Sequence, residues 1–281
     1  MSRTGDSRPW VEIRPSRRFF PRLDVKELWD YRDVGLILAQ RDLKVRYKQT
    51  FFGVGWALIQ PLLAMIVFTV ILGPSGVGIP SEGVPYSAFA LAGLAVWFPF
   101  NTALTSAAES LTRNPEMVTK VYFPRLIAPL AAVLAPAVDL AIAMTIAIVV
   151  ALIVGVPPQP TMLLLPVCCA AILVVAAALG VWLASLNVLY RDVRYALSFG
   201  LQLLFFASPV VYPSSVTESG WQYVFALNPL VGVIGVVRWA LLGVPTPSAG
   251  VMWISLGSTV VLLVTALLFF RHAERQFADR I

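Results

Sequence analysis

Six apolar stretches dominate the sequence, and each is about as long as a helix must be to cross a lipid bilayer. A transmembrane helix needs about 20 predominantly apolar residues, because each residue adds about 1.5 Å and the hydrocarbon core is about 30 Å thick. The stretches cover roughly residues 54–73, 86–106, 126–155, 161–186, 196–213 and 249–270. This pattern predicts an all-α polytopic membrane protein with six transmembrane helices.

Charged residues are scarce, and they are segregated along the chain. They make up 13% of the 281 residues, against roughly 25% in soluble domains, and most lie before Thr50 or in clusters between apolar stretches. The net charge of +6 could suggest nucleic acid, but these cations flank spans, which favours contact with anionic lipid. Cys168 and Cys169 are adjacent in an apolar stretch, where they predict packing residues and no metal site.

The basic residues also predict the orientation of the chain. With six spans, 20 of the 21 Lys and Arg residues fall on one side, and only Arg238 falls on the other. Cytoplasmic loops retain positive charge, so we expect both termini in the cytoplasm of a bacterial cell. The sequence shows no cleavable signal peptide, and the first span is expected to direct insertion. The predicted organisation is a cytoplasmic segment 1–50, a membrane domain 51–271 and a cytoplasmic tail 272–281.

Two apolar stretches contain features that a regular span does not. The third can tilt or break at Pro136, and the fifth ends in Ser208-Pro209, where a regular helix cannot continue. The outer segment 212–248 is too apolar for a solvated loop, and it is interrupted at Asn228-Pro229 and at Gly243. We therefore expect two short re-entrant helices between spans five and six.

The segment before the first span predicts an amphipathic helix on the inner membrane surface. Leu28, Tyr31, Val34 and Leu38 recur at helical spacing within residues 24–49. A strongly basic run at residues 41–48 follows, and it is either a positive-inside anchor or a surface that meets a cytoplasmic partner or an anionic lipid substrate. Candidates for a substrate entrance on this helix are Trp29, Tyr31, Arg41, Lys44, Arg46 and Lys48.

Several blocks, in order from about residue 28 to 245, resemble the membrane subunit of type-2 ABC exporters of polysaccharides. The blocks are Leu28-Trp29-Asp30-Tyr31-Arg32, residues 41–50, Gly53-Val54-Gly55-Trp56-Ala57, Gln60-Pro61, residues 120–125, residues 187–195, residues 208–213 and Asn228-Pro229-Leu230. The resemblance covers exporters of lipid-linked O-antigen, capsule, teichoic acid and cell-wall galactan. It implies a homodimer of this chain that assembles with two ATPase subunits.

The chain itself lacks a site for ATP. A phosphate-binding loop needs Gly directly before its Lys, and none of the four lysines has one. ATP and Mg²⁺ are therefore expected on the separate ATPase. The inner segments around 109–125 and 187–195 are either solvated connectors or, as the resemblance implies, the surface that couples to it. The candidate coupling residues are Arg113, Glu116, Met117, Lys120, Tyr122, Arg191, Asp192 and Arg194.

A conduit for a sugar polymer needs aromatic faces, which stack on the apolar side of a sugar ring and release it. Within the spans, the candidate lining residues are Trp97, Phe98, Phe100, Asp139, Phe205 and Phe206. Asp139 is the only acidic residue deep in a span, where burial costs about 2.5–3.5 kcal/mol on insertion scales, so it needs a partner or water. We expect it at the subunit interface or in the conduit.

The outer end of the fifth span and the segment after it predict an exit-side gate. Its candidate residues are Pro209, Tyr212, Pro213, Asn228, Pro229 and Arg238. Arg238 could bind a phosphate of the lipid carrier or pair with a lipid headgroup. Family members often carry an acidic residue three positions earlier, where this chain has Gly235, so an ion pair expected there is absent.

Two other functions compete with export. A proton-coupled secondary transporter would use Asp139, although the spans offer no His or Lys to complete a relay. A membrane-embedded glycan-processing enzyme would need a carboxylate pair or metal ligands. Its case is weak, because the only histidine, His272, lies in the tail and the outer side offers only Glu82 and Glu218.

Overall fold

The computed structural model describes residues 25–48, 55–113, 123–190, 192–214 and 221–280, and the regular elements in these ranges are all helices. They are α1 (Val25–Asp30), α2 (Arg32–Lys48), α3 (Gly55–Leu72), α4 (Tyr86–Arg113), α6 (Ile127–Leu134), α7 (Pro136–Ile153), the 3₁₀ helix η1 (Pro160–Leu164), α8 (Leu165–Leu189), α9 (Val193–Phe206), α10 (Trp221–Phe225), α11 (Pro229–Leu242) and α12 (Ala249–Arg280). The all-α class predicted from the sequence is confirmed.

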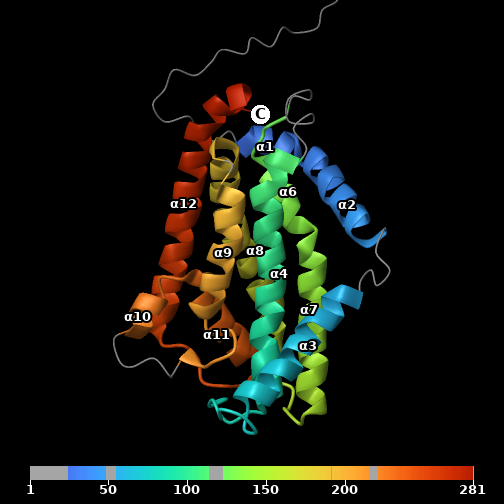
Figure 1. Cartoon of the computed structure of the whole chain (residues 1–281), viewed down its shortest axis with the longest axis vertical. Helices are drawn as coiled ribbons and strands as arrows, with labels where there is room; N and C mark the ends of the chain where they lie inside the picture. The colour runs from blue at the N-terminus through green and yellow to red at the C-terminus, as the bar shows by residue number, and fades with distance from the viewer. Residues whose placement is uncertain (1–24, 49–54, 114–122, 191, 215–220, 281) are drawn as a thin grey trace, which may run out of the picture.

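Helix α4 forms the centre of the molecule, with α7, α8, α9 and α12 arranged around it (Figure 1). Most of its residues are buried, and its alanines and Gly93 line the main hydrophobic core. Small side chains let neighbouring helices approach closely in a membrane. The contact with α8 depends on this, because a Cβ atom at Gly180 would overlap the side chain of Ala107. Polar groups on α4 are therefore fixed firmly relative to α8.

Five helical segments are long and apolar enough to cross a membrane among the described residues. They are Gly55–Leu72, Tyr86–Arg113, Ile127–Ile153, Pro160–Leu189 and Ala249–Phe277. The expected fifth span, 196–213, differs from the prediction, because α9 has 14 residues and ends at Phe206. A helix of that length is about 21 Å long, shorter than the hydrocarbon core. The count of six spans therefore stays a prediction.

The breaks expected from proline and glycine are present. The third span divides into α6 and α7, and Pro136 is the first residue of α7. In the segment after α9, the two expected short helices are α10 and α11. Asn228 caps the start of α11 by accepting a hydrogen bond from the Leu230 amide, and Gly243 ends it in the left-handed conformation that glycine favours.

The amphipathic stripe before the first span is confirmed, with one interruption at Tyr31 between α1 and α2. Leu38 is buried, and Leu28, Tyr31 and Val34 pack beside it. The cluster that they join also contains Phe123 and Ile127, together with Phe270, Ala273 and Phe277 from the last helix. The start of α1 and the end of α12 therefore lie at the same end of the bundle.

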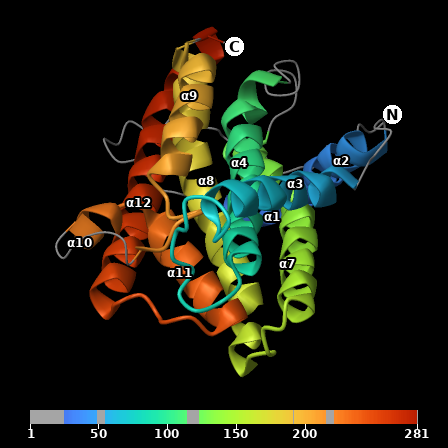
Figure 2. The same cartoon turned by 60° about the horizontal axis from the view of Figure 1, so that its bottom comes forward.

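Helices α2 and α3 sit outside the bundle of long helices. Both views place α2 on the side of α7 and away from α12 (Figure 1, Figure 2), and α3 crosses α4 obliquely. Apart from Pro61, no residue of α3 is fully buried. These two helices form one wall of the site that follows.

Candidate transport site

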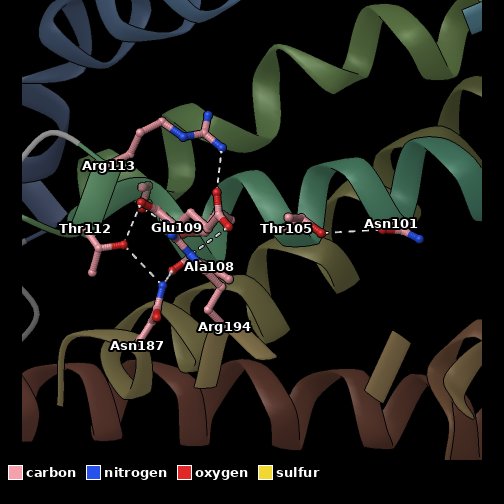
Figure 3. A network of polar contacts seen from close by, with 10 residues as sticks. Asn101, Thr105, Ala108, Glu109, Thr112, Arg113, Asn187 and Arg194 are labelled. Carbon is pink, nitrogen blue, oxygen red and sulfur yellow. Dashed lines mark hydrogen bonds and ion pairs between the residues drawn. The ribbon is translucent and has the colours of Figure 1, made fainter. Parts of the chain in front are cut away.

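The inner end of α4 carries a network of charged and amide side chains that joins three helices (Figure 3). The carboxylate of Glu109 accepts a hydrogen bond from Arg113 at 2.9 Å, one turn along α4, and pairs with Arg194 of α9 at 3.3 Å. The amide of Asn187, in α8, donates to the carbonyl oxygen of Ala108 and to the Thr112 hydroxyl. The network thus fixes the ends of α4 and α8 and the start of α9 relative to one another.

Two of the eight candidate coupling residues, Arg113 and Arg194, form ion pairs with the same carboxylate, that of Glu109. Asp192 is exposed directly before α9. The other five candidates, Glu116, Met117, Lys120, Tyr122 and Arg191, lie outside the described residues. Sequence reasoning did not select Glu109, although its spacing of four residues from Arg113 is the spacing at which helical side chains pair. The coupling role of these residues stays a prediction.

The carboxylate of Asp139, in α7, forms an ion pair with Arg46 of α2. Arg46 contacts one carboxylate oxygen at 2.7 Å, and the Tyr47 hydroxyl donates a hydrogen bond to the other. The Asp139 side chain is 7% exposed and that of Arg46 is 33% exposed. Burial and the hydrogen bond to Asp139 raise the pKa of Tyr47 well above its usual range, so this hydroxyl remains a donor at neutral pH.

Two hollows meet at Arg46. The first, about 470 Å³, lies between α2, α4 and α6 and is lined by Arg41, Asp42, Val45, Arg46, Ser106, Arg113, Ala132 and Ala135. The second, about 170 Å³, is lined by Arg46, Tyr47, Trp56, Ala57, Gln60, Pro61, Phe98, Pro99, Thr102, Asp139 and Ala143. The remaining entrance candidates lie elsewhere on α1 and α2: Lys44 and Lys48 are exposed, and Trp29 is 67% exposed with Arg32 over its ring.

An aromatic groove lies between α4 and α9. Trp97 meets the edge of Phe205 with 5.2 Å between ring centroids, and Phe205 meets Phe206 at 5.4 Å. The groove, about 560 Å³, is lined by Trp97, Asn101, Thr105, Ser198, Leu201, Gln202, Phe205 and Phe206. Its lining is thus aromatic and polar without a charged side chain.

The predicted conduit set separates into three places. Trp97, Phe205 and Phe206 line the aromatic groove, and their role in a conduit stays a prediction. The prediction that Phe100 lines a conduit is wrong for this conformation, because its side chain is fully buried against Trp97. Phe98 and Asp139 line the small hollow beside α2 instead, and their place in a conduit stays a prediction.

At the outer end, Arg238 holds the segment that follows α9. Its guanidinium donates to the carbonyl oxygens of Val210, at 2.6 Å, and Tyr212, at 3.1 Å, and it lies 3.6 Å from the centre of the Phe89 ring. Arg238 is 3% exposed. The expectation that it meets a lipid phosphate or headgroup is corrected, because the side chain is buried inside the molecule and donates to two backbone carbonyls.

The same segment has further anchors from α4 and α11. The Tyr86 hydroxyl donates to the Val211 carbonyl at 2.7 Å, and the Asn228 amide donates to the Ser208 hydroxyl at 2.8 Å. Pro209 and Pro213 are buried beside them, and Pro229 is buried as the first residue of α11. The candidate gate residues therefore lie close together. Residues 208–213, which we call the strap, are held by hydrogen bonds from Tyr86, Asn228 and Arg238.

A helical bundle with several segments long and apolar enough to span a membrane, charged at one end and with an uncharged groove, fits a multi-pass membrane transport subunit. The comparisons with known proteins agree with this class. The chain belongs to the ABC-2 type transporter family, whose model matches residues 35–242. This family works with an ABC ATPase.

Three relatives share most of their length with the chain. It is 30% identical to the O-antigen export system permease protein RfbA of Myxococcus xanthus over 260 residues, which is 92% of this chain and 98% of the relative. Two permease proteins of the same name from Klebsiella pneumoniae are 28% and 26% identical. These alignments cover 72% and 88% of this chain, and 77% and 94% of the relatives.

Proposed function

We propose that this chain is the permease subunit of an ATP-driven exporter that moves lipid-linked polysaccharide across the cytoplasmic membrane. The aromatic groove between α4 and α9 is the observation that carries the proposal. Trp97, Phe205 and Phe206 offer ring faces for the apolar side of sugars. Asn101, Thr105, Ser198 and Gln202 offer donors and acceptors for sugar hydroxyls. Without a charged side chain in the lining, no single sugar is held strongly.

The composition of the groove also supports a second copy of the chain. Gln202 and Ser198 are exposed, and Asn101 is half-buried, on helices that lie within apolar segments. Amide and hydroxyl groups that face lipid lose their hydrogen bonds with water and are costly. A second copy that covers this open side encloses the groove and gives it a polar, aqueous interior. The second copy would contact the faces of α9 and α4 that border the groove.

Energy comes from a separate ATPase that binds ATP and Mg²⁺, with two ATPase subunits for each permease dimer. In this arrangement both termini lie in the cytoplasm, on the side of Glu109, Arg113 and Arg194. The permease relatives named for O-antigen export support polysaccharide as the cargo. Teichoic acid, capsule and galactan polymers share the same requirements for a groove.

The proposal is tested by purifying the chain with its ATPase and measuring ATP hydrolysis with and without lipid-linked glycan. We expect the two to copurify and the glycan to change the turnover. Replacing Trp97 and Phe205 with Ala should reduce export strongly, because both ring platforms are lost. Trp253→Ala is the matched control, since this exposed tryptophan lies on α12 outside the groove.

Three outcomes would overturn the proposal. One is a chain that neither binds the ATPase nor alters its turnover. Another is full export by the Trp97 and Phe205 variant. The coupling surface has a test of its own: Arg113→Glu with Lys120→Glu should leave the chain in the membrane and uncouple ATP hydrolysis from export. Wild-type export from that double variant removes the coupling role.

A proton-coupled transporter is the second candidate, and its carboxylate is Asp139. Asp139 is engaged in an ion pair with Arg46 and accepts a hydrogen bond from Tyr47, which suits a structural contact better than a proton carrier. Export by Asp139→Asn that depends on ATP and not on a proton gradient would exclude the relay. No contact among the described residues favours the glycan-processing enzyme over export.

A further inference from the structure

Two rows of polar side chains run along the aromatic groove and end at one ion pair (Figure 3). Each row repeats every four residues, so its members lie on one face of their helix. The first two members of each row line the groove, and the last two are joined by a contact of 3.3 Å between Arg194 and Glu109. The rows are Asn101, Thr105 and Glu109 on α4, and Gln202, Ser198 and Arg194 on α9. The ion pair therefore bridges α4 and α9 one turn beyond the groove.

The two ends of the groove are closed in different ways. At one end Trp97 of α4 meets the edge of Phe205 with 5.2 Å between ring centroids, and Phe68 of α3 stacks on Phe205 at 6.0 Å. At the other end the contact is the Glu109–Arg194 pair, in which the Arg194 side chain is 56% exposed. Exposed ion pairs contribute little free energy, so this end is the easier one to open.

Helix α8 is packed firmly against α4, whereas α9 is not. A Cβ atom at Gly180 of α8 would overlap a side chain of α4, and the amide of Asn187 donates to two oxygen atoms of α4. By contrast, α9 buries only Leu197 and Leu201 among its 14 residues, all of which the structure describes. A Cβ atom at Gly200 would meet no other atom within 4 Å. Helix α9 can therefore tilt relative to a fixed pair of α4 and α8.

Glu109 has a second partner that stays in place if α9 moves. Arg113 lies one turn along α4 and contacts the other oxygen of the same carboxylate at 2.9 Å (Figure 3). When Arg194 leaves, the charge of Glu109 is still paired, and the exposed guanidinium of Arg194 reaches water. Neither charge is left buried without a partner, which lowers the cost of separation.

We propose that Glu109 and Arg194 close one end of the aromatic groove, and that a glycan chain enters when Arg194 leaves Glu109 to its pair with Arg113. This rests on the proposed function, which makes the groove the path of the polymer. Arg194 lies in the first turn of α9, directly after the candidate coupling residue Asp192. A movement of the start of α9 by the ATPase therefore opens this end of the groove.

The accessibility of the groove tests this closure on the permease alone. The full chain in nanodiscs carries Thr105→Cys as a reporter, because Thr105 is half-buried and lines the groove. Cys168→Ala and Cys169→Ala remove the natural thiols, and the probe is a membrane-impermeant maleimide. If Thr105→Cys does not fold, Ser198→Cys serves as the reporter on the α9 side of the groove.

The rate of maleimide labelling should rise several-fold with Arg194→Gln, because the contact between α4 and α9 is lost. Arg113→Gln is the matched control, since it removes an arginine of similar exposure from the same carboxylate and leaves that contact in place. It should leave the rate unchanged or lower it. No acceleration with Arg194→Gln, or an equal acceleration with Arg113→Gln, overturns the closure.

A crosslink tests whether the pair must separate during export. Glu109→Cys with Arg194→Cys, joined by a short bis-methanethiosulfonate reagent, should abolish export with the ATPase, and dithiothreitol should restore it. Thr112→Cys with Asn187→Cys is the control pair, because it joins α4 to α8, which stay together. Export that survives the first crosslink, or that is lost equally with the second, overturns the proposal. Because labelling needs neither ATPase nor glycan, its failure leaves the tests of the proposed function untouched.

Discussion

Two arginines that contact the bundle, Arg238 and Arg46, are neutralised by different kinds of partner. Arg238 gives its hydrogen bonds to two backbone carbonyls and its face to Phe89, and it is almost completely enclosed. Arg46 gives its charge to one side-chain carboxylate, remains one-third exposed and borders two hollows. A cation bonded to fixed carbonyls can only hold its segment in place. A cation paired with a carboxylate beside open space can change partners.

We therefore expect the contacts of Arg238 to contribute more to the stability of the fold than the contacts of Arg46. The outer strap at residues 208–213 is tied by Arg238, Tyr86 and Asn228, so it is a fixed wall in this conformation. The opposite end is joined by ion pairs between side chains, in which Arg46 is 33% and Arg194 56% exposed. Four substitutions test this difference, beginning with the largest expected effect.

Arg238→Met should be the most destabilising. It leaves the carbonyl oxygens of Val210 and Tyr212 without this donor, and each buried acceptor that is left unsatisfied costs about 1–3 kcal/mol. Thermal unfolding of the purified protein, followed by tryptophan fluorescence, measures the loss. Arg32→Met, at an exposed arginine, is the control and should change stability by less than about 0.5 kcal/mol. Equal stability of the two variants would contradict a structural role for Arg238.

Gly93→Ala tests the same strap from the side of α4. A Cβ atom there would overlap the Val210 carbonyl oxygen, which Arg238 holds in position. Overpacking of this kind costs about 1–3 kcal/mol. Gly200→Ala is the matched control in α9, where a Cβ atom meets no other atom within 4 Å, and it should leave stability unchanged or slightly raised. The same thermal measurement applies, and a neutral Gly93→Ala would mean that the strap can move away.

Asp139→Ala tests the inner arginine and should cost less than Arg238→Met. Arg46 is one-third exposed, so it can reach water after losing its partner, and we expect a loss of about 1–2 kcal/mol in unfolding free energy. A double-mutant cycle with Arg46→Gln isolates the energy of the pair. A coupling energy as large as the whole effect of Arg238→Met would remove the distinction between fixed and exchangeable ends.

Glu109→Gln should have the smallest effect on stability. Its partners Arg113 and Arg194 are more than half-exposed, and such pairs contribute about 0–1 kcal/mol. The difference from the wild type should shrink as salt is added, because exposed charges are screened. Unfolding midpoints at low and high ionic strength check this. A difference that persists in high salt would show that the network is buried in the assembled protein.

The sequence predicted most elements of the fold because their signals are local. Apolar length gave five of the six expected spans, and Pro136, Asn228 and Gly243 marked breaks that the structure contains. The stripe through Leu38 also predicted the packed face of the interface helix. Helix α9 was assigned too great a length, because the apolar pattern continues through Ser208-Pro209 although the helix has already ended at Phe206.

The candidate site could be predicted only in part, because residue type does not reveal a partner that is distant in sequence. Trp97, Phe205 and Phe206 line one groove, but Phe100 lies one turn from Trp97 on a helix that is buried on nearly all sides. Glu109 could have been found from its spacing to Arg113. Nothing in the sequence pairs Asp139 with Arg46, which lies 93 positions away.

By itself, the sequence determined that this chain is an α-helical membrane protein with an amphipathic helix before its first span and charges segregated from its apolar stretches. Length, periodicity and charge segregation are sufficient for that, because the cost of polar groups in hydrocarbon acts on each segment separately. Tertiary structure decided which arginine is fixed and which can exchange. Along the chain, Arg238 is a single cation in an apolar segment, whereas Arg46 belongs to a basic run. Only the contact of α2 with α7, and of α11 with the segment after α9, gives Arg46 a carboxylate beside a hollow and Arg238 a pair of backbone carbonyls.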